Sequence, residues 1–329
     1  MRTLFAYARP MTTDTDSVHV VLGASGAAGS ALVSALAEAG LPARGVNRSG
    51  RPAQAPSSVG WATAEVTDPD SIGAALSAAG VVYMSAQPAY HRWPQEFPAM
   101  LDSVMTATAR AGARLVMVDN LYAYGPGSSP MDEGTPARAT DPKGRTRAQM
   151  AATLLAAHEA GRLEVVIGRA SDYFGPSAEN SGITALAIEP VAGNGRLRWM
   201  GTLDAAHSCA FLPDIARAYV ALGTADDVSG RAWHLPHTAP VTGREFLSLV
   251  NAALPQPRGT AVVSTTMLRL AAPFHRISRE SLSIAYQWTE PFVVDDSAFR
   301  SRFPDVPVTP LAEAVARTVS WYRDEAAAR

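Results

Sequence analysis

Short apolar runs rich in β-branched residues alternate with alanine-rich segments along the first half of the chain. Apolar runs bounded by turn residues predict strands at 18–23, 42–48, 81–86, 114–120 and 163–170. The segments between them predict helices at about 29–40, 69–79, 95–112 and 144–160. Strands and helices in this order form a parallel sheet with helices on both faces, so the fold class is α/β.

The second half of the chain is less regular. After Gly175 the pattern loosens, but a helix near Pro213 and a strand at 231–235 predict a return to the sheet. The sequence therefore predicts three parts. They are a flexible tail at 1–16, a sheet domain at 17–175 with 211–235, and a smaller α+β C-terminal substrate lobe at 176–210 and 236–329, which ends in a helix from Leu311.

Three glycines follow the first predicted strand, in the stretch VHVVLGASGAAG. Gly23 permits a tight strand-to-helix turn, Gly26 lets the backbone approach a pyrophosphate, and Gly29 lets the helix pack closely on the sheet. The amide groups and the positive dipole end of the new helix then face the phosphates. We therefore expect a Rossmann-like doubly wound sheet that binds a nucleotide cofactor, with Ser25, Ala27 and Ala28 completing the turn.

The residues after the second strand bear on the choice of cofactor. Selectivity for NAD usually requires an acidic residue here, whereas this chain has Asn47, Arg48 and Ser49. Arg48 offers a charged planar fork that fits a 2′-phosphate, and its neighbours can add neutral hydrogen bonds. NADPH is therefore the predicted cofactor, with NADH possible; the alternative for Arg48 is a solvated surface charge.

Further positions are expected beside the cofactor because ligands collect at the carboxyl ends of the strands. Glu65 and Val66 are expected near the adenine, and Ser85 and Ala86 close the next strand.

Composition narrows the range of possible functions and partners. The chain is 47% hydrophobic and 18% charged with a net charge of −2, which indicates a globular protein and predicts neither a nucleic acid nor a membrane as partner. The single cysteine, Cys209, excludes an internal disulfide and a cysteine-based zinc site, and no metal is expected. The N-terminal residues lack the apolar core of a secretory signal, so we expect a cytoplasmic location.

Seven stretches in this order resemble one protein family: GASGAAG, AEVTDPDS, VVYMSA, LVMVDNLYAYGP, PMDEGTP, DPKGRTR and GRASDYFGP. The chain resembles the extended short-chain dehydrogenase/reductases of the epimerase/dehydratase group from about Val18 to Gly175, and more weakly to Asp214. The resemblance implies an NAD(P)-dependent oxidoreductase with a small-molecule substrate. It also implies cofactor contacts from Asn120, Lys143, Ala170 and Asp172.

The catalytic positions depart from the family pattern. The Ser or Thr of the usual Ser-Tyr-Lys triad corresponds to Asn120, and the Tyr-x-x-x-Lys pair corresponds to Lys143 and Arg147. In that triad the tyrosine donates a proton to the carbonyl oxygen as hydride arrives. The chain is thus similar to the atypical extended members, and it contains no obvious acid.

Several sources of the proton stay open at this point. Lys143 could donate it, since free lysine and tyrosine both titrate near a pKa of about 10. It could equally be a surface residue or a ribose contact. Arg147 could bind the ribose or stabilise an alkoxide, Asn120 could hydrogen-bond the carbonyl oxygen, and Tyr122 or Tyr124 could be displaced donors. A phenol beside the substrate's own ketone could also supply the proton.

The resemblance also indicates a substrate class. DNLYAYGPG and GRASDYFGP are similar to actinobacterial angucyclinone ketoreductases of simocyclinone-type antibiotic biosynthesis, which implies an aromatic polyketide ketone as substrate. Candidate substrate contacts are aromatic or histidine side chains, each with core packing as the alternative: Tyr90, His91, Trp93, Tyr173, Phe174, Trp199 and Trp288.

Two other functions stay open. Without the triad, the chain could be a non-catalytic NADPH-binding sensor. It could also be a nucleotide-sugar epimerase or dehydratase, although that chemistry needs the missing tyrosine as a base. The segments 95–112 and 144–160 fit a dimer face as well as packing on the sheet, so the sequence does not decide the oligomeric state.

Overall fold

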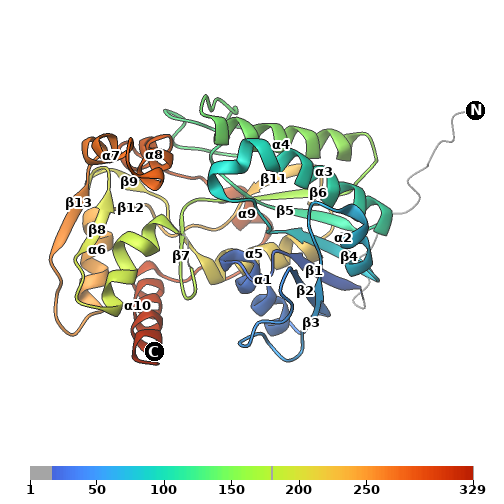
Figure 1. The fold of residues 1–329 in the computed structure, drawn as a ribbon, viewed down its shortest axis with the longest axis horizontal. Coiled ribbons are helices and arrows are strands. Elements are labelled where there is room, and N and C mark those ends of the chain that lie inside the picture. The colour runs from blue at the N-terminus through green and yellow to red at the C-terminus, as the bar shows by residue number, and fades with distance from the viewer. Residues whose placement is uncertain (1–16, 179–180, 329) are drawn as a thin grey trace, which may run out of the picture. The chain divides into compact units, whose positions relative to one another are not determined.

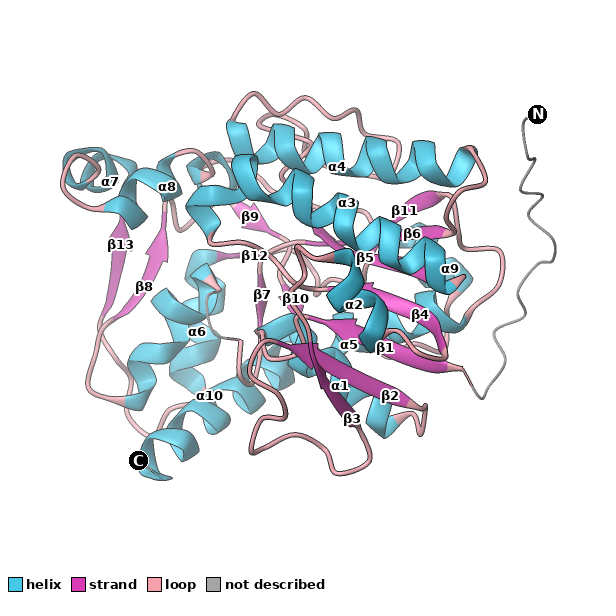
Figure 2. Ribbon diagram, turned by 45° about the vertical axis from the view of Figure 1, so that its right-hand side comes forward, coloured by secondary structure: helices cyan, strands magenta, loops and turns pink. Residues whose placement is uncertain are grey.

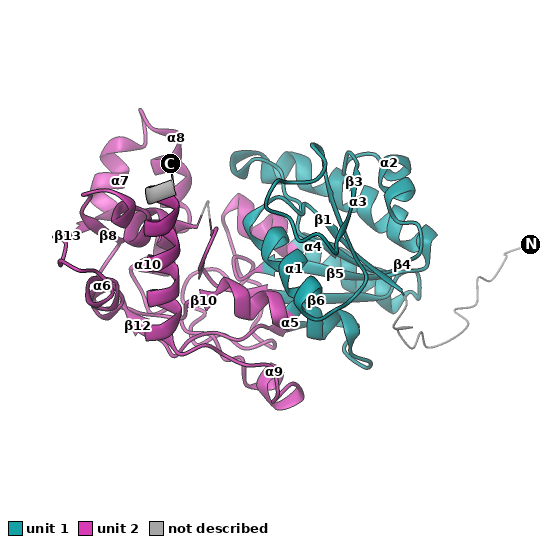
Figure 3. Cartoon of the chain, turned by 90° about the horizontal axis from the view of Figure 1, so that it is seen from below, with its two compact units in different colours: residues 1–119, 149–168, 219–232 teal, residues 120–148, 169–218, 233–329 magenta. Residues whose placement is uncertain are grey.

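The computed structural model describes residues 17–178 and 181–328 (Figure 1). The predicted tail at 1–16 lies outside these residues. The described chain divides into two compact units, drawn in different colours in Figure 3. Unit 1 comprises residues up to 119 with 149–168 and 219–232, and unit 2 comprises 120–148, 169–218 and 233 onward.

A seven-stranded sheet forms the centre of the nucleotide-binding half (Figure 2). Its strands, in spatial order, are β11 (Arg231–His234), β6 (Val165–Ala170), β5 (Arg114–Asn120), β4 (Ala79–Met84), β1 (Val18–Leu22), β2 (Ala43–Asn47) and β3 (Gly60–Thr63). The pairs β1–β2, β1–β4, β2–β3 and β4–β5 are parallel. The predicted α/β class and the return of 231–235 to the sheet are confirmed.

The helices are α1 (Ala27–Glu38), α2 (Pro69–Ala75), α3 (Trp93–Ala111), α4 (Pro142–Glu159), α5 (Leu212–Thr224), α6 (Gly243–Ala252), α7 (Thr265–Ala271), α8 (Arg276–Leu282), α9 (Ser297–Arg302) and α10 (Leu311–Ala328). Four shorter helical turns are η1 (Tyr90–Arg92), η2 (Thr184–Ile188), η3 (Glu189–Ala192) and η4 (Ala285–Trp288). Within unit 1, α1 lies on one face of the sheet and α2 with α3 on the other (Figure 1).

The sequence pattern missed β3 and overran α2. β3 is a sheet-edge strand whose four residues alternate poorly between apolar and polar, so its pattern is weak. The indole of Trp61 lies where a Cβ on Gly45 of β2 would be, 2.6 Å from that position, and this contact holds the strand in place. The predicted helix 69–79 ends at Ala75, and Ala78 takes a positive φ of 58° before β4 begins.

Unit 2 has small sheets and its own core. Its strand pairs are β7 (Tyr173–Phe174) with β10 (Ala210–Phe211), β9 (Ala206–His207) with β12 (Val241–Thr242), and β8 (Leu197–Met200) with β13 (Thr260–Val263). One apolar cluster of unit 2 joins α6 and α10 to β8 and includes Phe174, Trp199, Phe246 and Trp288. The expected boundary at 175 therefore falls inside a compact unit, because β7 pairs with β10.

No helix in the described part of the chain is both long and apolar enough to cross a membrane. Within the same residues, no cluster of three His, Cys, Asp or Glu side chains is arranged to hold a metal ion.

A buried histidine lies in the middle of the sheet. His19 of β1 is hydrogen-bonded through Nδ1 to the hydroxyl of Tyr83 on β4, at 2.9 Å. Burial, with a smaller contribution from Arg114, lowers the pKa of His19 to about 4. The folded protein thus keeps this imidazole neutral at pH values where an unfolded chain would protonate it.

This shift predicts a pH dependence of stability. Between pH 6.5 and about 4 the unfolded state binds a proton at His19 that the folded state does not, so stability falls as the pH falls. The stability lost there is about 1.4 kcal/mol per pH unit for each such proton. Urea unfolding at pH 7 and pH 5 should show a shallower pH dependence for His19→Gln than for the wild type. An equal dependence in both proteins would show that His19 is not the group responsible.

Candidate functional site

One candidate region, within unit 1, is the turn between β1 and α1. Gly23 has a φ of +84°, and a Cβ there would lie 2.5 Å from the backbone nitrogen of Ala86. Gly23 and Ala24 both donate their N–H groups to the carbonyl oxygen of Val46, at 2.9 and 3.1 Å. The ends of β1, β2 and β4 therefore meet in backbone contact at this turn.

The other two glycines of the turn differ in what surrounds them. A Cβ on Gly29 would lie 2.2 Å from the carbonyl oxygen of Gly23, so the packing of α1 on the turn excludes any side chain. At Gly26, which is exposed, the nearest contact would be an ordinary 3.5 Å. Packing does not explain glycine at this position, whereas the close approach of a ligand does.

The N-terminus of α1 suits an anion. Gly26 is the N-cap residue, and no side chain caps the helix. The first amide groups of a 12-residue helix and its positive dipole end therefore lie beside the exposed Gly26. This arrangement fits the pyrophosphate of a dinucleotide.

The loop after β2 is held by Asn47. Its Oδ1 accepts the N–H groups of Ser49 and Gly50, at 3.0 and 2.6 Å, and its Nδ2 donates to the carbonyl oxygen of Gly50. The buried Asn47 amide thus shapes the loop, while Arg48 and Ser49 are exposed. We predicted Asn47 as a neutral cofactor contact, but its side chain holds the backbone that presents Arg48.

The remaining cofactor candidates of unit 1 lie near this edge of the sheet. Ser85 and Ala86 follow β4 directly against the Gly23 turn, as their position at a strand end predicts. Glu65 is exposed after β3, and its carboxylate accepts the hydroxyl of Thr67 at 3.2 Å.

Unit 2 contains a second candidate region, at the start of α4. The carboxylate of Asp141 accepts the backbone N–H groups of Lys143 and Gly144, both at 3.0 Å, and so caps the helix. A Cβ on Gly144 would lie 2.5 Å from the carbonyl oxygen of Tyr122. The first turn of α4 thus packs directly on the loop that follows β5.

Lys143 is buried and makes an ion pair with Glu280 of α8. Its side chain is 6% exposed and that of Glu280 is 22% exposed. One prediction left open for Lys143, a solvated surface residue, is therefore wrong. The pair sets the position of the Lys143 ammonium and compensates its charge.

Asn120 and Arg147 are the two other triad-equivalent residues. Asn120 ends β5, and its Oδ1 accepts the N–H of Tyr122 at 3.1 Å, so its amide NH₂ is the part that could reach a ligand. Arg147 is buried one turn along α4 from Lys143 and faces the same side of the helix.

Tyr124 belongs to a buried network. Arg169 donates to its hydroxyl oxygen at 2.8 Å, and the hydroxyl lies 2.6 Å from Nε2 of His234. Nδ1 of His234 faces the carbonyl oxygen of Asp295 at 3.0 Å, so Nε2 accepts the proton of Tyr124. Burial lowers the pKa of His234, which favours this neutral state. The idea that Tyr124 is a displaced proton donor is therefore wrong, because its hydroxyl is committed to these two partners.

Asp172, which stays a predicted cofactor contact, pairs with a histidine. Nε2 of His207 lies 3.1 Å from Oδ2 of Asp172, and Nδ1 lies 3.0 Å from the carbonyl oxygen of Gln287. Both ring nitrogens of His207 thus face oxygen atoms. The ring also stacks on Trp288 and on Phe292, with centroids 4.7 and 5.3 Å away, and these contacts fix its orientation.

Four of the predicted substrate contacts are core residues. The buried side chains are Trp93, Phe174, Trp199 and Trp288, each at most 3% exposed. The last three belong to the unit 2 core, and Trp93 donates its indole N–H to the carbonyl oxygen of Pro88. Substrate contact is the wrong interpretation for these four, because packing already accounts for them. The half-buried candidates are Tyr90, His91 and Tyr173.

The sequence did not single out two residues that contact candidate positions, Glu280 and His207. Glu280 and His207 carry no motif that links them to Lys143 and Asp172, from which they are distant in the chain. Tyr286 is half-buried, and burial raises its pKa to about 12, with Asp141 and Asp172 adding to the shift. It is therefore a neutral phenol, and its hydroxyl accepts a long 3.4 Å hydrogen bond from Gln287.

Comparison with known proteins identifies the relatives of this chain. The sequence model of the NAD dependent epimerase/dehydratase family matches residues 19–235. Among curated proteins, no sequence match was found.

Solved structures share the fold at low identity. An epimerase from Methanothermobacter thermautotrophicus has a TM-score of 0.78 at 15% identity, and the match covers 94% of each chain. The dTDP-glucose 4,6-dehydratase of Bacillus anthracis, solved with NAD, has a TM-score of 0.76 at 14% identity over 94% of this chain and 97% of that one. The Bordetella bronchiseptica enzyme WbmH, solved with NAD⁺, has a TM-score of 0.72 at 18% identity, with 94% and 99% covered.

The contrast between Gly26 and Gly29 predicts different outcomes for matched substitutions. Gly26→Val should weaken dinucleotide binding by about tenfold or more, with little change in melting temperature, because its Cβ meets ligand rather than protein. Gly29→Val should destabilise the fold, since its Cβ would overlap the Gly23 carbonyl. Calorimetric titration and thermal melts measure both effects. Unchanged binding in folded Gly26→Val protein would contradict the assigned ligand site.

The Tyr124 network predicts a structural role for that residue. Tyr124→Phe leaves Arg169 and His234 without their shared partner, so the free energy of unfolding should fall by about 1–3 kcal/mol. Tyr286→Phe, which removes one long hydrogen bond, is the matched control and should cost less. Denaturant unfolding measures both, and equal small losses would argue against the network.

Proposed function

The chain belongs to the NAD-dependent epimerase/dehydratase family, and we propose that it is an NADPH-dependent ketoreductase that acts on an aromatic polyketide ketone of the angucyclinone type. The observation that carries this proposal is the buried Lys143–Glu280 ion pair, at the position where the family usually has a phenolic acid. A ketone whose own phenol supplies the proton would not need that acid.

The residues around Gly26 would hold the cofactor through its pyrophosphate. When bound, the nicotinamide supplies a hydride to the carbonyl carbon of the substrate. When the cofactor is bound, we expect Lys143, Arg147 and Asn120 to position the ribose or the ketone oxygen through hydrogen bonds that they donate. Arg147 in particular cannot give up a proton, but it can stabilise a developing alkoxide.

Reduction of the ketone also needs a proton for the carbonyl oxygen. A positioned acid usually contributes about 10²–10⁴ in rate, so its loss has to be offset. Tyr124 is committed to Arg169 and His234, and Lys143 is held by Glu280. A phenol next to the ketone already donates an internal hydrogen bond to the reacting oxygen, and such intramolecular groups act at very high effective concentration. Its proton passes to the alkoxide, and the phenolate regains a proton from water.

The substrate class rests on the resemblance of DNLYAYGPG and GRASDYFGP to angucyclinone ketoreductases. Aromatic polyketides commonly carry a hydroxyl group beside a ring ketone. The half-buried Tyr90, His91 and Tyr173 offer aromatic surface and polar tips for such a flat ligand.

The other candidate functions are less well supported. The names of similar structures include nucleotide-sugar epimerases and dehydratases, but that chemistry needs the tyrosine base that Lys143 replaces. A protein that only senses NADPH would bind the cofactor but would not oxidise it. Incubation with NADPH and a polycyclic ketone, followed at the absorbance of NADPH, separates the reductase from both.

Arg48 predicts the cofactor preference. Arg48→Ala should weaken NADPH binding by about 10–100-fold, which corresponds to a lost charge-assisted hydrogen bond, and should leave NADH binding nearly unchanged. Arg51→Ala is the matched control because Arg51 is an exposed arginine nearby that binds the carbonyl oxygens of Ala55 and Pro56. Titration with both nucleotides tests this; equal weakening of NADPH and NADH would contradict a 2′-phosphate contact.

The proton source predicts the behaviour of a modified substrate. Methylation of the phenol next to the ketone should slow reduction by about 10²-fold or more, since the internal proton is lost. The dissociation constant of the methyl ether is measured separately, so that a binding defect is not mistaken for a chemical one. Unchanged turnover with unchanged binding would rule out substrate-assisted protonation.

A further inference from the structure

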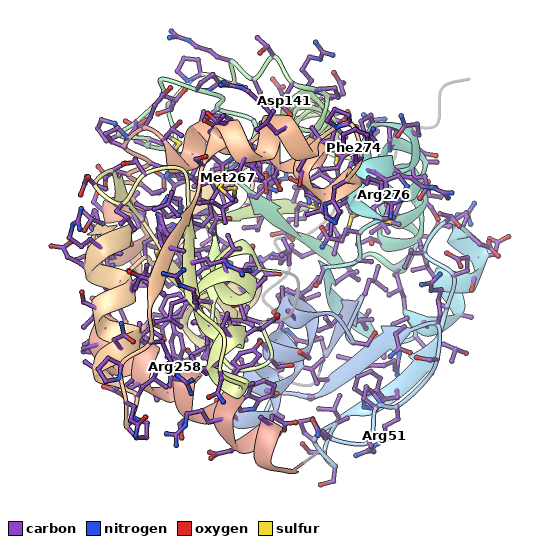
Figure 4. The ribbon with its side chains drawn as sticks, turned by 60° about the vertical axis from the view of Figure 1, so that its left-hand side comes forward. Arg51, Asp141, Arg258, Met267, Phe274 and Arg276 are labelled. Carbon is purple, nitrogen blue, oxygen red and sulfur yellow. The ribbon has the colours of Figure 1, made fainter. Side chains whose placement is uncertain are left out.

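Exposed apolar side chains gather in one segment of unit 2. Among the described residues, the large hydrophobic side chains with high exposure are Met267, Leu270, Phe274 and Ile277, at 56%, 73%, 93% and 69%. All four lie on α7, on α8 or on the turn between them. We call this the α7–α8 surface, and Figure 4 labels Met267 and Phe274 on it.

The segment that carries the α7–α8 surface is folded. The hydroxyl of Ser264 accepts the N–H of Met267 and caps α7, and the N–H of His275 donates to the carbonyl oxygen of Ala271 at 2.8 Å. Leu268 is buried on the inner side of α7, and Glu280 of α8 is paired with Lys143. Exposure of the four apolar side chains is therefore a property of the folded surface.

The charges on this surface are all of one sign. Arg269, Arg276 and Arg279 are exposed between and beside the apolar residues, and the one acidic residue of the two helices, Glu280, faces Lys143. The whole chain carries a net charge of −2, so this concentration of arginine is local.

We propose that the α7–α8 surface docks the protein on an anionic membrane surface. Guanidinium groups bind lipid phosphates through paired hydrogen bonds, while Phe274 and its apolar neighbours enter the boundary between headgroups and acyl chains. Each arginine near an anionic bilayer strengthens binding by about fivefold. The expectation that the protein has no membrane partner rested on its overall charge, which does not reveal this local arrangement.

Two other occupants fit less well. A second copy joined through the same surface would bring arginines against arginines, which like-charge repulsion opposes. An acidic protein would need a pocket shaped for Phe274, which projects with 93% exposure from a turn. A bilayer accepts such a side chain without a matching shape. The inference is independent of the proposed reaction.

Co-sedimentation of the full chain with vesicles tests the proposal. Vesicles of phosphatidylcholine with phosphatidylglycerol are compared with phosphatidylcholine alone, at low and high salt. We expect binding to the anionic vesicles that weakens with salt. It should fall about tenfold or more in Phe274→Ser, and by a similar or larger factor in Arg276→Glu/Arg279→Glu. Leu270→Ser replaces Phe274→Ser if the latter does not fold.

Arg323→Glu is the matched control because it reverses an exposed arginine on α10, outside the α7–α8 surface, and should bind vesicles as the wild type does. Failure of the wild type to sediment with anionic vesicles would overturn the proposal. So would binding to polyglutamate in place of vesicles, which would favour an acidic protein. A concentration-dependent dimer that Phe274→Ser dissociates, without vesicle binding, would favour a second copy and overturn it as well.

Discussion

At the end of β1, the backbone of Gly23 is in close contact with the backbone of Ala86 and of Gly29. The position of the predicted nucleotide-binding turn depends on these contacts. Gly23 turns the chain with a positive φ against Ala86, and Gly29 brings the first turn of α1 onto the carbonyl group of Gly23. Because no side chain fits between these atoms, the N-terminus of α1 is held at the carboxyl edge of the sheet. Packing does not explain why the exposed position 26 is a glycine. The uncapped amide groups beside Gly26 suit a pyrophosphate, which would come close to its backbone.

The residues at the triad-equivalent positions, unlike the glycines of the turn, depart from the family pattern. The cofactor turn keeps all three glycines of its pattern, whereas the position of the usual phenol is a buried lysine whose charge is balanced by Glu280. Taking a lysine out of water is costly unless a partner compensates its charge, so this ion pair is a built feature of unit 2. In the proposed reaction, this substitution removes the phenolic acid and keeps the scaffold around it.

Much of the fold could be predicted from the sequence because its signals are local. The five predicted strands all occur within two residues of their expected ends, since buried strands and their flanking glycines produce strong patterns. β3 was missed because an exposed edge strand has little apolar alternation. Gly26 could be identified because the strand, the glycines and the helix around it form a known pattern, and Arg48 stays a predicted 2′-phosphate contact from its place after β2.

Other features of the candidate site could not be predicted, because they depend on contacts between residues that are distant in the sequence. Glu280 reaches Lys143 from 137 positions away, and His207 reaches Asp172 across 35, so neither pair leaves a motif. The aromatic candidates Trp199 and Phe174 were assigned to substrate because composition alone cannot separate a core ring from a ligand-binding ring; burial does.

The most direct measurement of the central claim is the rate of hydride transfer in a single turnover, with a hydroxy-substituted aromatic ketone and the variant Lys143→Met/Glu280→Gln. Removing both partners avoids an unpaired buried charge. If the substrate supplies the proton, the rate should stay within about tenfold of the wild type once cofactor and ketone are saturating. A fall of about 10²–10⁴-fold under the same conditions would show that Lys143 is the acid and would contradict the account.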